Sequence, residues 1–326
     1  MRASDRVRLG RTDVTVTRLG LGTAGLAGLF RPVTRADAAA TFEAAWNHGV
    51  RFFDTAPVYG YSLGEIRTGA ALGAKPRADY TLATKVGRLL RRDAPPERGG
   101  VFFGTPPLNP VFDFSYDGVM RSVEESRKRL GIERIDILHI HDPDDHFDEA
   151  LSGAYRALDE LRRRGDIKAV GAGMNQAEML AEFARRGEFD CFLLAGRYTL
   201  LDQVGLKELL PLCEERGIAI IAGGVFNSGI LADPKPGATY NYRDAPEALI
   251  ERARRISAVC ERHGVPLRAA ALQFPLAHPA VHSVLVGCRS AAQVEDTVRM
   301  FETEIPRELW ADLKRERLIA DEAPTP

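Results

Sequence analysis

The sequence has few cysteines, and none lies in a pattern that pairs or binds metal. The four cysteines are Cys191, Cys213, Cys260 and Cys288, and no two of them form a CxxC pair. This spacing argues against both a disulfide framework and a zinc knuckle. We therefore expect buried free thiols and a cytoplasmic protein.

Long apolar runs and an excess of one charge are also absent. No apolar run approaches the roughly 18–20 residues that span a bilayer, and the opening MRASDRVRLG lacks the apolar region of a secretory signal. The net charge is −1, with both signs interspersed. This balance excludes the basic footprint of a protein that binds nucleic acid or an anionic membrane. We expect a small-molecule partner, and the sequence leaves the oligomeric state open.

Short β-rich runs alternate with longer amphipathic segments along the 326 residues. Apolar residues recur at helical spacing in segments such as 147–165, and these segments stop at glycines such as Gly131 and Gly217. Eight strands, each followed by a helix, predict one α/β domain over residues 1–326, a (β/α)8 TIM barrel. A doubly wound open sheet is the alternative. The expected strands are 18–22, 50–54, 80–84, 135–140, 169–172, 191–195, 219–222 and 283–286.

Several segments lie outside this alternation. Residues 1–16 predict an N-terminal β-hairpin that closes one face of the barrel, residues 307–319 predict a last helix, and residues 320–326 are expected to fray. Residues 88–115 and 231–246 are expected to be long loops, which are uncommon in compact domains and usually functional. Both follow strands, so we place them at the C-terminal face, where barrel active sites form.

The segment GLGTAG, residues 20–25, matches the dinucleotide-binding pattern GxGxxG. That pattern requires a helix that opens directly after the glycines. Here Pro32 delays the helix, so we interpret the segment as a glycine-rich strand end where another group packs close to the backbone.

Four polar residues stand at or just after the ends of three neighbouring strands: Asp54, Tyr59, Lys85 and His141. The carboxyl ends of barrel strands meet at one rim, so these side chains are expected to share a pocket. An ammonium near a phenol lowers its pKa, and a carboxylate behind the lysine keeps the lysine charged. This set makes the tyrosine a general acid or base for an alcohol–carbonyl pair when a hydride carrier lies alongside.

Taken singly, each of these residues also fits a structural role. Asp54 can cap a turn, Tyr59 can pack at the rim, Lys85 can be solvated, and His141 can be a core histidine like His139. The nearby run HDPDDH is rich in metal-ligand types, but it lies on a loop and lacks a helix-spaced histidine pair. We expect no metal site.

Seven stretches, distributed over nearly the whole chain, match one known family in their order and spacing. They are LGLGT, FFDTAPVYG, LATKVG, RLGIERIDILHIHDPD, IKAVGAGMNQ, YTLLDQ and LVGCRSAAQVEDT. With these stretches the sequence resembles the aldo-keto reductase superfamily. The resemblance implies a barrel that binds NAD(P)H in an extended form at the rim. It also implies a catalytic tetrad, which maps onto Tyr59, Asp54, Lys85 and His141.

The resemblance carries over less completely to the nicotinamide contacts. The family's Ser-Asn after the fifth strand is Met174-Asn175 here, its Gln after the sixth is Ala195, and its Ser-Pro-Leu after the seventh reads GVF. These departures leave the tetrad intact. The cofactor residues implied are Gly22, Thr23, Asn175, Tyr198, Gly224, Val225 and Phe226.

The resemblance places a phosphate and adenosine site after the eighth strand. Gly287, Arg289 and Ser290 open a helix there, and its N-terminal N–H groups suit a phosphate. NADP-specific relatives often carry a second basic residue where this chain has Gln293. The expected cofactor is NAD or NADP, with a slight preference for NAD; Arg289 as a solvated surface charge is the alternative.

Within the superfamily, HIHDPDDH and FLLAGRYTLLDQ resemble the branch of D-threo-aldose and L-fucose dehydrogenases. We therefore expect oxidation of the anomeric hydroxyl of an aldose to a lactone. Alternatives are a pyridoxal 4-dehydrogenase, a general NADPH-dependent aldehyde or ketone reductase, and a non-catalytic nucleotide sensor. Candidate substrate or flap residues are Asp142, Asp145, Phe102, Phe103, Phe112, Tyr240 and Tyr242.

Overall fold

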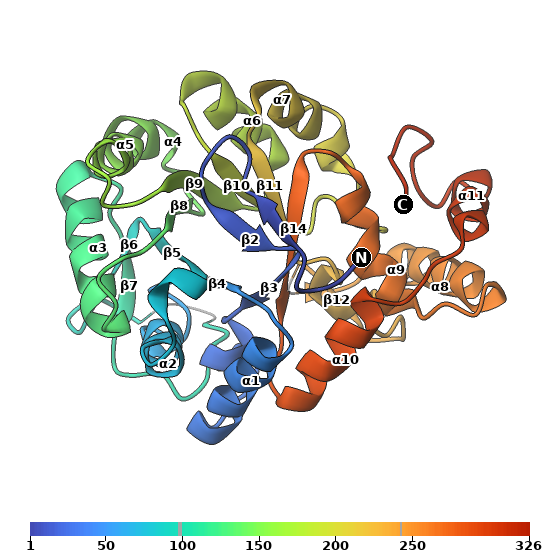
Figure 1. The fold of residues 1–326 in the computed structure, drawn as a ribbon, viewed down its shortest axis with the longest axis horizontal. Coiled ribbons are helices and arrows are strands. Elements are labelled where there is room, and N and C mark those ends of the chain that lie inside the picture. The colour runs from blue at the N-terminus through green and yellow to red at the C-terminus, as the bar shows by residue number, and fades with distance from the viewer. Residues whose placement is uncertain (97–99, 242) are drawn as a thin grey trace.

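Eight parallel strands close into a barrel surrounded by helices in the computed structural model (Figure 1). The structure describes residues 1–96, 100–241 and 243–326. The barrel order is β10-β11-β14-β3-β4-β5-β8-β9, which confirms the predicted TIM barrel and rules out the open sheet. The barrel strands are β3 (Leu19–Gly22), β4 (Phe52–Asp54), β5 (Thr81–Val86), β8 (Ile137–His141), β9 (Ala169–Met174), β10 (Cys191–Ala195), β11 (Ala219–Gly223) and β14 (Val281–Gly287).

Helices cover the outside of the barrel because each presents an apolar stripe to the strands. In α5, for example, Leu158 and Leu161 are buried while Arg163 faces outward. Side-chain caps fix the starts of α1, α3 and α10; in α3, Ser115 accepts a hydrogen bond from the backbone N–H of Gly118 at 3.1 Å. The longer helices are α1 (Arg35–Asn47), α2 (Leu63–Leu72), α3 (Tyr116–Leu130), α5 (Arg156–Arg163), α6 (Ala177–Arg186), α7 (Leu209–Arg216), α8 (Glu247–Arg262), α9 (Leu267–Gln273), α10 (Ala291–Phe301) and α11 (Arg307–Arg315).

The expected N-terminal hairpin is present as β1 (Arg6–Arg8) and β2 (Thr15–Thr17), which pair antiparallel. Its apolar residues Leu9, Val14 and Val16 are buried and pack against barrel residues such as Phe52 and Ile221. The hairpin therefore fills the barrel end at which the strands begin.

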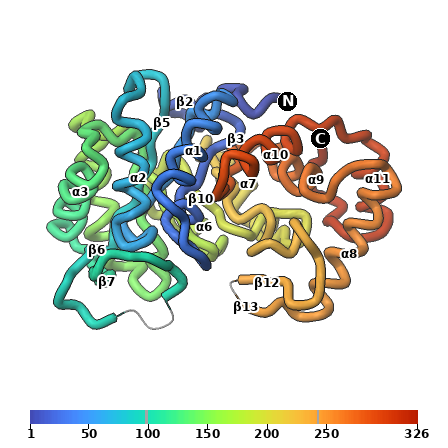
Figure 2. The backbone as a smooth tube through the Cα atoms, turned by 90° about the horizontal axis from the view of Figure 1, so that it is seen from below, coloured from blue at the N-terminus to red at the C-terminus, as the bar shows by residue number. Residues whose placement is uncertain are grey.

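The two segments expected to be loops contain short strands of their own. Residues 88–115 include β6 (Arg88–Arg91) and β7 (Asn109–Phe112), which form an antiparallel pair. Residues 231–246 include β12 (Thr239–Tyr240) and β13 (Arg243–Asp244). Figure 2 shows both pairs at the same end of the barrel, opposite the N-terminus. They rise above the rim where the strands end.

The C-terminal tail, residues 320–326, is buried at one residue and exposed at its last. Ala323 is fully buried, and its N–H donates to the carbonyl of Ala320. The end of the chain therefore packs against the body of the protein.

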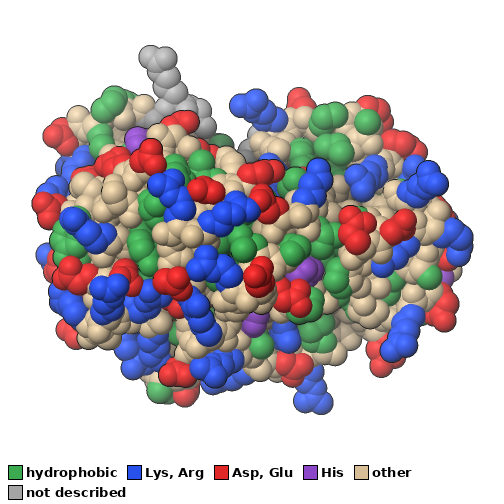
Figure 3. Space-filling view, turned by 90° about the horizontal axis from the view of Figure 1, so that it is seen from above, with side chains coloured by type: hydrophobic (Ala, Val, Ile, Leu, Met, Phe, Trp, Pro, Cys, Tyr) green, Lys and Arg blue, Asp and Glu red, His purple; other side chains and the backbone are tan. Residues whose placement is uncertain are grey.

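Acidic and basic side chains are mixed over the face drawn in Figure 3. Within the described ranges, no helix has both the length and the apolar character needed to cross a bilayer.

Candidate active site

The rim of the barrel brings the four predicted catalytic side chains together. Asp54 ends β4, Lys85 lies near the end of β5, His141 ends β8, and Tyr59 lies in the loop after β4. The Lys85 Nζ atom donates to Asp54 Oδ1 at 2.5 Å and to the carbonyl of Thr55 at 2.8 Å. The lysine is thus fixed by a carboxylate and a carbonyl from the neighbouring strand.

Tyr59 lies over this ion pair and beside the histidine. The Lys85 Nζ atom is 4.7 Å from the centre of the Tyr59 ring. The rings of Tyr59 and His141 are 5.7 Å apart and meet edge to face at 85°. The phenol, the ammonium and the imidazole therefore surround one point at the top of the barrel.

Burial sets the protonation of these groups. Burial raises the pKa of Tyr59 to about 12, while the positive charge of Lys85 lowers it. We expected a lowered pKa; the direction of the lysine's effect is as expected, but desolvation outweighs it. Burial, and then the charges of Arg88 and Lys85, hold the pKa of His141 well below its usual range. His141 is therefore neutral at physiological pH and can donate one hydrogen bond.

An inner pocket of about 320 Å³ opens beside the tetrad. Tyr59, Lys85 and His141 form its polar end, with Arg88 and Asp142 next to them. Most of the remaining wall is apolar. The apolar side chains are Ala24, Leu29, Val58, Val101, Phe102, Met174, Leu193 and Ala195.

An outer cleft of about 370 Å³ adjoins the inner pocket. The two share Tyr59 and Asn175 as part of a common wall. Many residues of the cleft are glycines, so the backbone is open to a ligand. These glycines are Gly22, Gly25, Gly196, Gly223, Gly224, Gly229 and Gly287.

Most of the expected cofactor residues line this outer cleft. Thr23 is buried directly beside it, and Tyr198 packs in the core against Phe274, with the ring centres 5.3 Å apart. Ser290 and Gln293 lie next to the cleft at the start of α10. The expected residues that do line the cleft are Gly22, Asn175, Gly224, Val225, Phe226, Gly287 and Arg289.

The start of α10 fits a phosphate group. Ser290 caps the helix by accepting from the N–H of Gln293, and the Gln293 side chain accepts from the N–H of Arg289 at 2.8 Å. Arg289 donates to the carbonyl of Leu29 at 3.1 Å, and its Nε atom is buried without a hydrogen-bond partner in the described ranges. A helix N-terminus beside a half-buried arginine suits the pyrophosphate or ribose phosphate of a dinucleotide.

The expected substrate residues divide between the pocket and the surface. Asp142 and Phe102 line the inner pocket. Asp145 and Phe103 are exposed and are not among the residues that line it. Phe112 lies next to the pocket wall, where its ring packs on Arg88.

The expected flap residues stand apart from both cavities. The Tyr240 hydroxyl donates to Asp202 at 2.8 Å, and Tyr240 lines neither cavity. Tyr242 lies outside the described residues.

Sequence reasoning missed Arg88, Val58 and Leu193 as pocket residues. Val58 and Leu193 look like ordinary core residues in the sequence. The position of Arg88, three residues after Lys85, is the one feature of the sequence that could have indicated a pocket residue. Whether its side chain enters the pocket depends on the turn of the backbone at Gly87.

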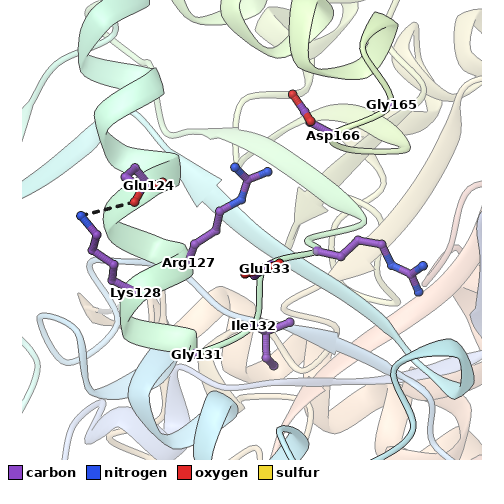
Figure 4. Close-up of a pocket in the computed structure, with 9 residues that line it drawn as sticks. Glu124, Arg127, Lys128, Gly131, Ile132, Glu133, Gly165 and Asp166 are labelled. Carbon is purple, nitrogen blue, oxygen red and sulfur yellow. Dashed lines mark ion pairs between the residues drawn. The ribbon is translucent and has the colours of Figure 1, made fainter.

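A separate hollow of about 690 Å³ lies at the opposite end of the strands, between the end of α3 and the turn before β9 (Figure 4). Its side chains are mostly charged, and Glu124 and Lys128 pair across one turn of α3 at 3.3 Å. None of the tetrad lines it, and this end of a barrel generally serves stability.

Comparison with known proteins agrees with this geometry. The sequence pattern of the Aldo/keto reductase family matches residues 18–316. Pyridoxal 4-dehydrogenase of Microbacterium luteolum is 46% identical over 98% of this chain and 99% of its own length. D-threo-aldose 1-dehydrogenase of a Pseudomonas species is 42% identical over 96% of each chain. A solved aldo-keto reductase from Bacillus halodurans superposes with a TM-score of 0.75 at 26% identity, covering 96% of each chain.

Proposed function

The chain belongs to the aldo/keto reductase family, whose members use NAD(P)H to act on CH–OH and carbonyl groups, and on this premise we propose that it oxidises the cyclic hemiacetal of pyridoxal to the lactone. The sequence alone ranked an aldose first. The higher identity to the pyridoxal enzyme, 46% against 42%, favours the order proposed now.

The apolar wall of the inner pocket is the observation that carries the proposal. Leu29, Val58, Phe102, Met174 and Leu193 offer no side-chain hydrogen bonds. A sugar that carries hydroxyls around its ring would leave several of them without partners against this wall, and each unmet buried hydrogen bond is costly. A flat heteroaromatic ring matches the wall and places its one reacting carbon at the polar end.

The chain's own residues divide the work of the reaction. Tyr59 accepts the proton of the hemiacetal hydroxyl, and the charge of Lys85 favours the phenolate that accepts it. Asp54 holds Lys85 in place, and neutral His141 donates a hydrogen bond to the substrate oxygen. When it is bound in the outer cleft, the nicotinamide of NAD(P) supplies the hydride acceptor.

An aldose is the second candidate, supported by the relative that is a D-threo-aldose 1-dehydrogenase. Asp142 and Arg88 at the polar end of the pocket are residue types that bind sugar hydroxyls. The chemistry would be the same, because a cyclic hemiacetal again loses its hydroxyl proton and a hydride.

The test is the formation of reduced nucleotide, followed by absorbance at about 340 nm. NAD and NADP are each offered with pyridoxal, L-fucose, D-arabinose and L-galactose, and NADPH is offered with simple aldehydes. We expect the largest kcat/KM with pyridoxal. Faster oxidation of the sugars would make the aldose the substrate, and turnover of simple aldehydes alone would replace both candidates by a general reductase.

A further inference from the structure

Arg88 is a charged side chain of the inner pocket to which the proposed oxidation of pyridoxal gives no role. It begins β6, and its side chain is 15% exposed. Its Nη2 atom donates to Asp142 Oδ2 at 2.7 Å, and its guanidinium lies 4.9 Å from the centre of the Phe112 ring. Its Nε atom is buried and has no hydrogen-bond partner in the part of the chain that the structure describes. An acceptor atom of a ligand would complete this donor.

Asp142 holds the guanidinium close to the reacting end of the pocket. Asp142 Oδ2 lies 3.5 Å from His141 Nε2 as well as 2.7 Å from Arg88. One carboxylate oxygen thus lies between the imidazole and the guanidinium. Asp142 has a φ of +42°, in the left-handed region that non-glycine residues adopt only uncommonly. The fold therefore imposes this position on Asp142.

We propose that Arg88 determines specificity by binding an anionic oxygen on the ring atom next to the one that bears the hemiacetal carbon. The substrate class it selects is a 3-hydroxypyridine hemiacetal, and this inference rests on the proposed function. Such a substrate carries an acidic phenol beside its reacting group. With the hemiacetal oxygen at His141, the phenolate is on the side of Arg88.

A phenolate fits Arg88 better than a sugar hydroxyl does. Guanidinium has five N–H donors in a planar fork, and hydrogen bonds to an anionic acceptor are roughly twice as strong as those to a neutral one. Asp142 occupies Nη2, and Nε stays free for a second acceptor. The Phe112 ring restricts the guanidinium plane, so little side-chain freedom remains to be lost on binding.

The experiment compares two hemiacetals in the intact enzyme. Pyridoxal is one; the other is 1,3-dihydroisobenzofuran-1-ol, which has the same fused hemiacetal ring but neither the phenol nor the ring nitrogen. We expect Arg88→Gln to lower kcat/KM for pyridoxal by about 10- to 100-fold and for the analogue by less than about threefold. Arg88→Lys keeps the charge without the fork and is expected to restore part of the difference.

Arg91→Gln is the matched control. Arg91 lies on the same strand, but it pairs with Glu125 at 3.0 Å and does not line the pocket. We expect this variant to change kcat/KM for neither substrate. Arg88→Lys also serves as the test variant if Arg88→Gln does not fold.

The outcomes separate this inference from the proposed function. If the wild-type enzyme oxidises pyridoxal and Arg88→Gln lowers kcat/KM equally for both substrates, Arg88 does not determine specificity, while the proposed function stands. If the wild-type enzyme leaves pyridoxal untouched and oxidises aldoses, the proposed function is wrong, and the inference falls with it. A loss of kcat/KM that is confined to pyridoxal supports both the proposed function and the role of Arg88 in specificity.

Discussion

At the scale of single residues, the site depends on an ion pair that has almost no contact with water. The side chains of Lys85 and Asp54 are 2% and 1% exposed. Removing one partner of such a pair leaves an uncompensated buried charge, which is strongly destabilising. Asp54 Oδ1 accepts from Lys85, while Oδ2 has no hydrogen-bond partner in the described ranges, so the carboxylate depends on the lysine.

Replacing Tyr59 tests the general base. We expect Tyr59→Phe to lower kcat by about 100-fold or more, because a positioned acid or base contributes about 10²–10⁴. Nucleotide affinity, measured by fluorescence titration, should stay within about twofold, since most of the outer cleft is unchanged. Tyr116→Phe is the control, because that hydroxyl binds Glu160 on the outer helices. Full activity of Tyr59→Phe would exclude Tyr59 as the base.

Replacing Lys85 tests the source of the phenolate. The pKa of Tyr59 is about 12, so the phenolate fraction and kcat/KM for oxidation should rise with pH below that value. Lys85 lowers this pKa, and Lys85→Met removes the positive charge. The rise in a pH–rate profile should therefore move to higher pH, while Lys85→Arg keeps the charge and should move it less. An unmoved profile for Lys85→Met would show that the lysine does not act on the phenol.

At the scale of elements, the barrel could be predicted because short apolar runs alternate with longer amphipathic segments, several of which stop at a glycine. The β6–β7 hairpin could not, because Arg-Leu-Leu-Arg does not alternate and Pro110 interrupts β7. The tetrad could be predicted because Asp54, Lys85 and His141 stand at or near strand ends, with Tyr59 in the loop after Asp54. Arg88 did not, since its entry into the pocket depends on how the chain turns after β5.

Gly87 makes that turn, with a φ of +103°. A Cβ atom at this position would lie 2.1 Å from the Phe114 ring. We expect Gly87→Ala to destabilise the fold by about 1–3 kcal/mol and to raise KM, because the hairpin that carries Arg88 must shift.

Gly104→Ala is the comparison for this change. Gly104 also has a positive φ, of +70°, but a Cβ there meets no atom within 4 Å. Chemical denaturation measures the free energy of unfolding of each variant, and steady-state kinetics measures its KM. Equal effects of the two changes on KM would show that the hairpin does not set the pocket.

At the scale of the whole molecule, His139 couples stability to pH. Burial, and then the charge of Lys85, lower the pKa of this core histidine to about 3, against about 6.5 in an unfolded chain. Between these values the unfolded state binds a proton that the folded state does not. The stability present above pH 6.5 is therefore lost as the pH falls towards 3, by up to about 1.4 kcal/mol per pH unit.

His139→Leu removes this contribution. We expect the free energy of unfolding of the variant to fall less between about pH 6.5 and 4.5 than that of the wild-type protein. Urea denaturation at the two pH values measures the difference, and His48→Asn, at an exposed histidine, is the control. An unchanged pH dependence would mean that His139 takes up its proton without unfolding.

The hairpin of β1 and β2 closes one end of the barrel and so limits how molecules reach the active site. Leu9, Val14 and Val16 fill the end where the strands begin, so the active-site cavities open at the opposite end, the rim where the strands end. Substrate and product then enter and leave through the same rim, where the two cavities lie. Departure of the product through this rim is therefore a step that can limit turnover, as it does in many enzymes.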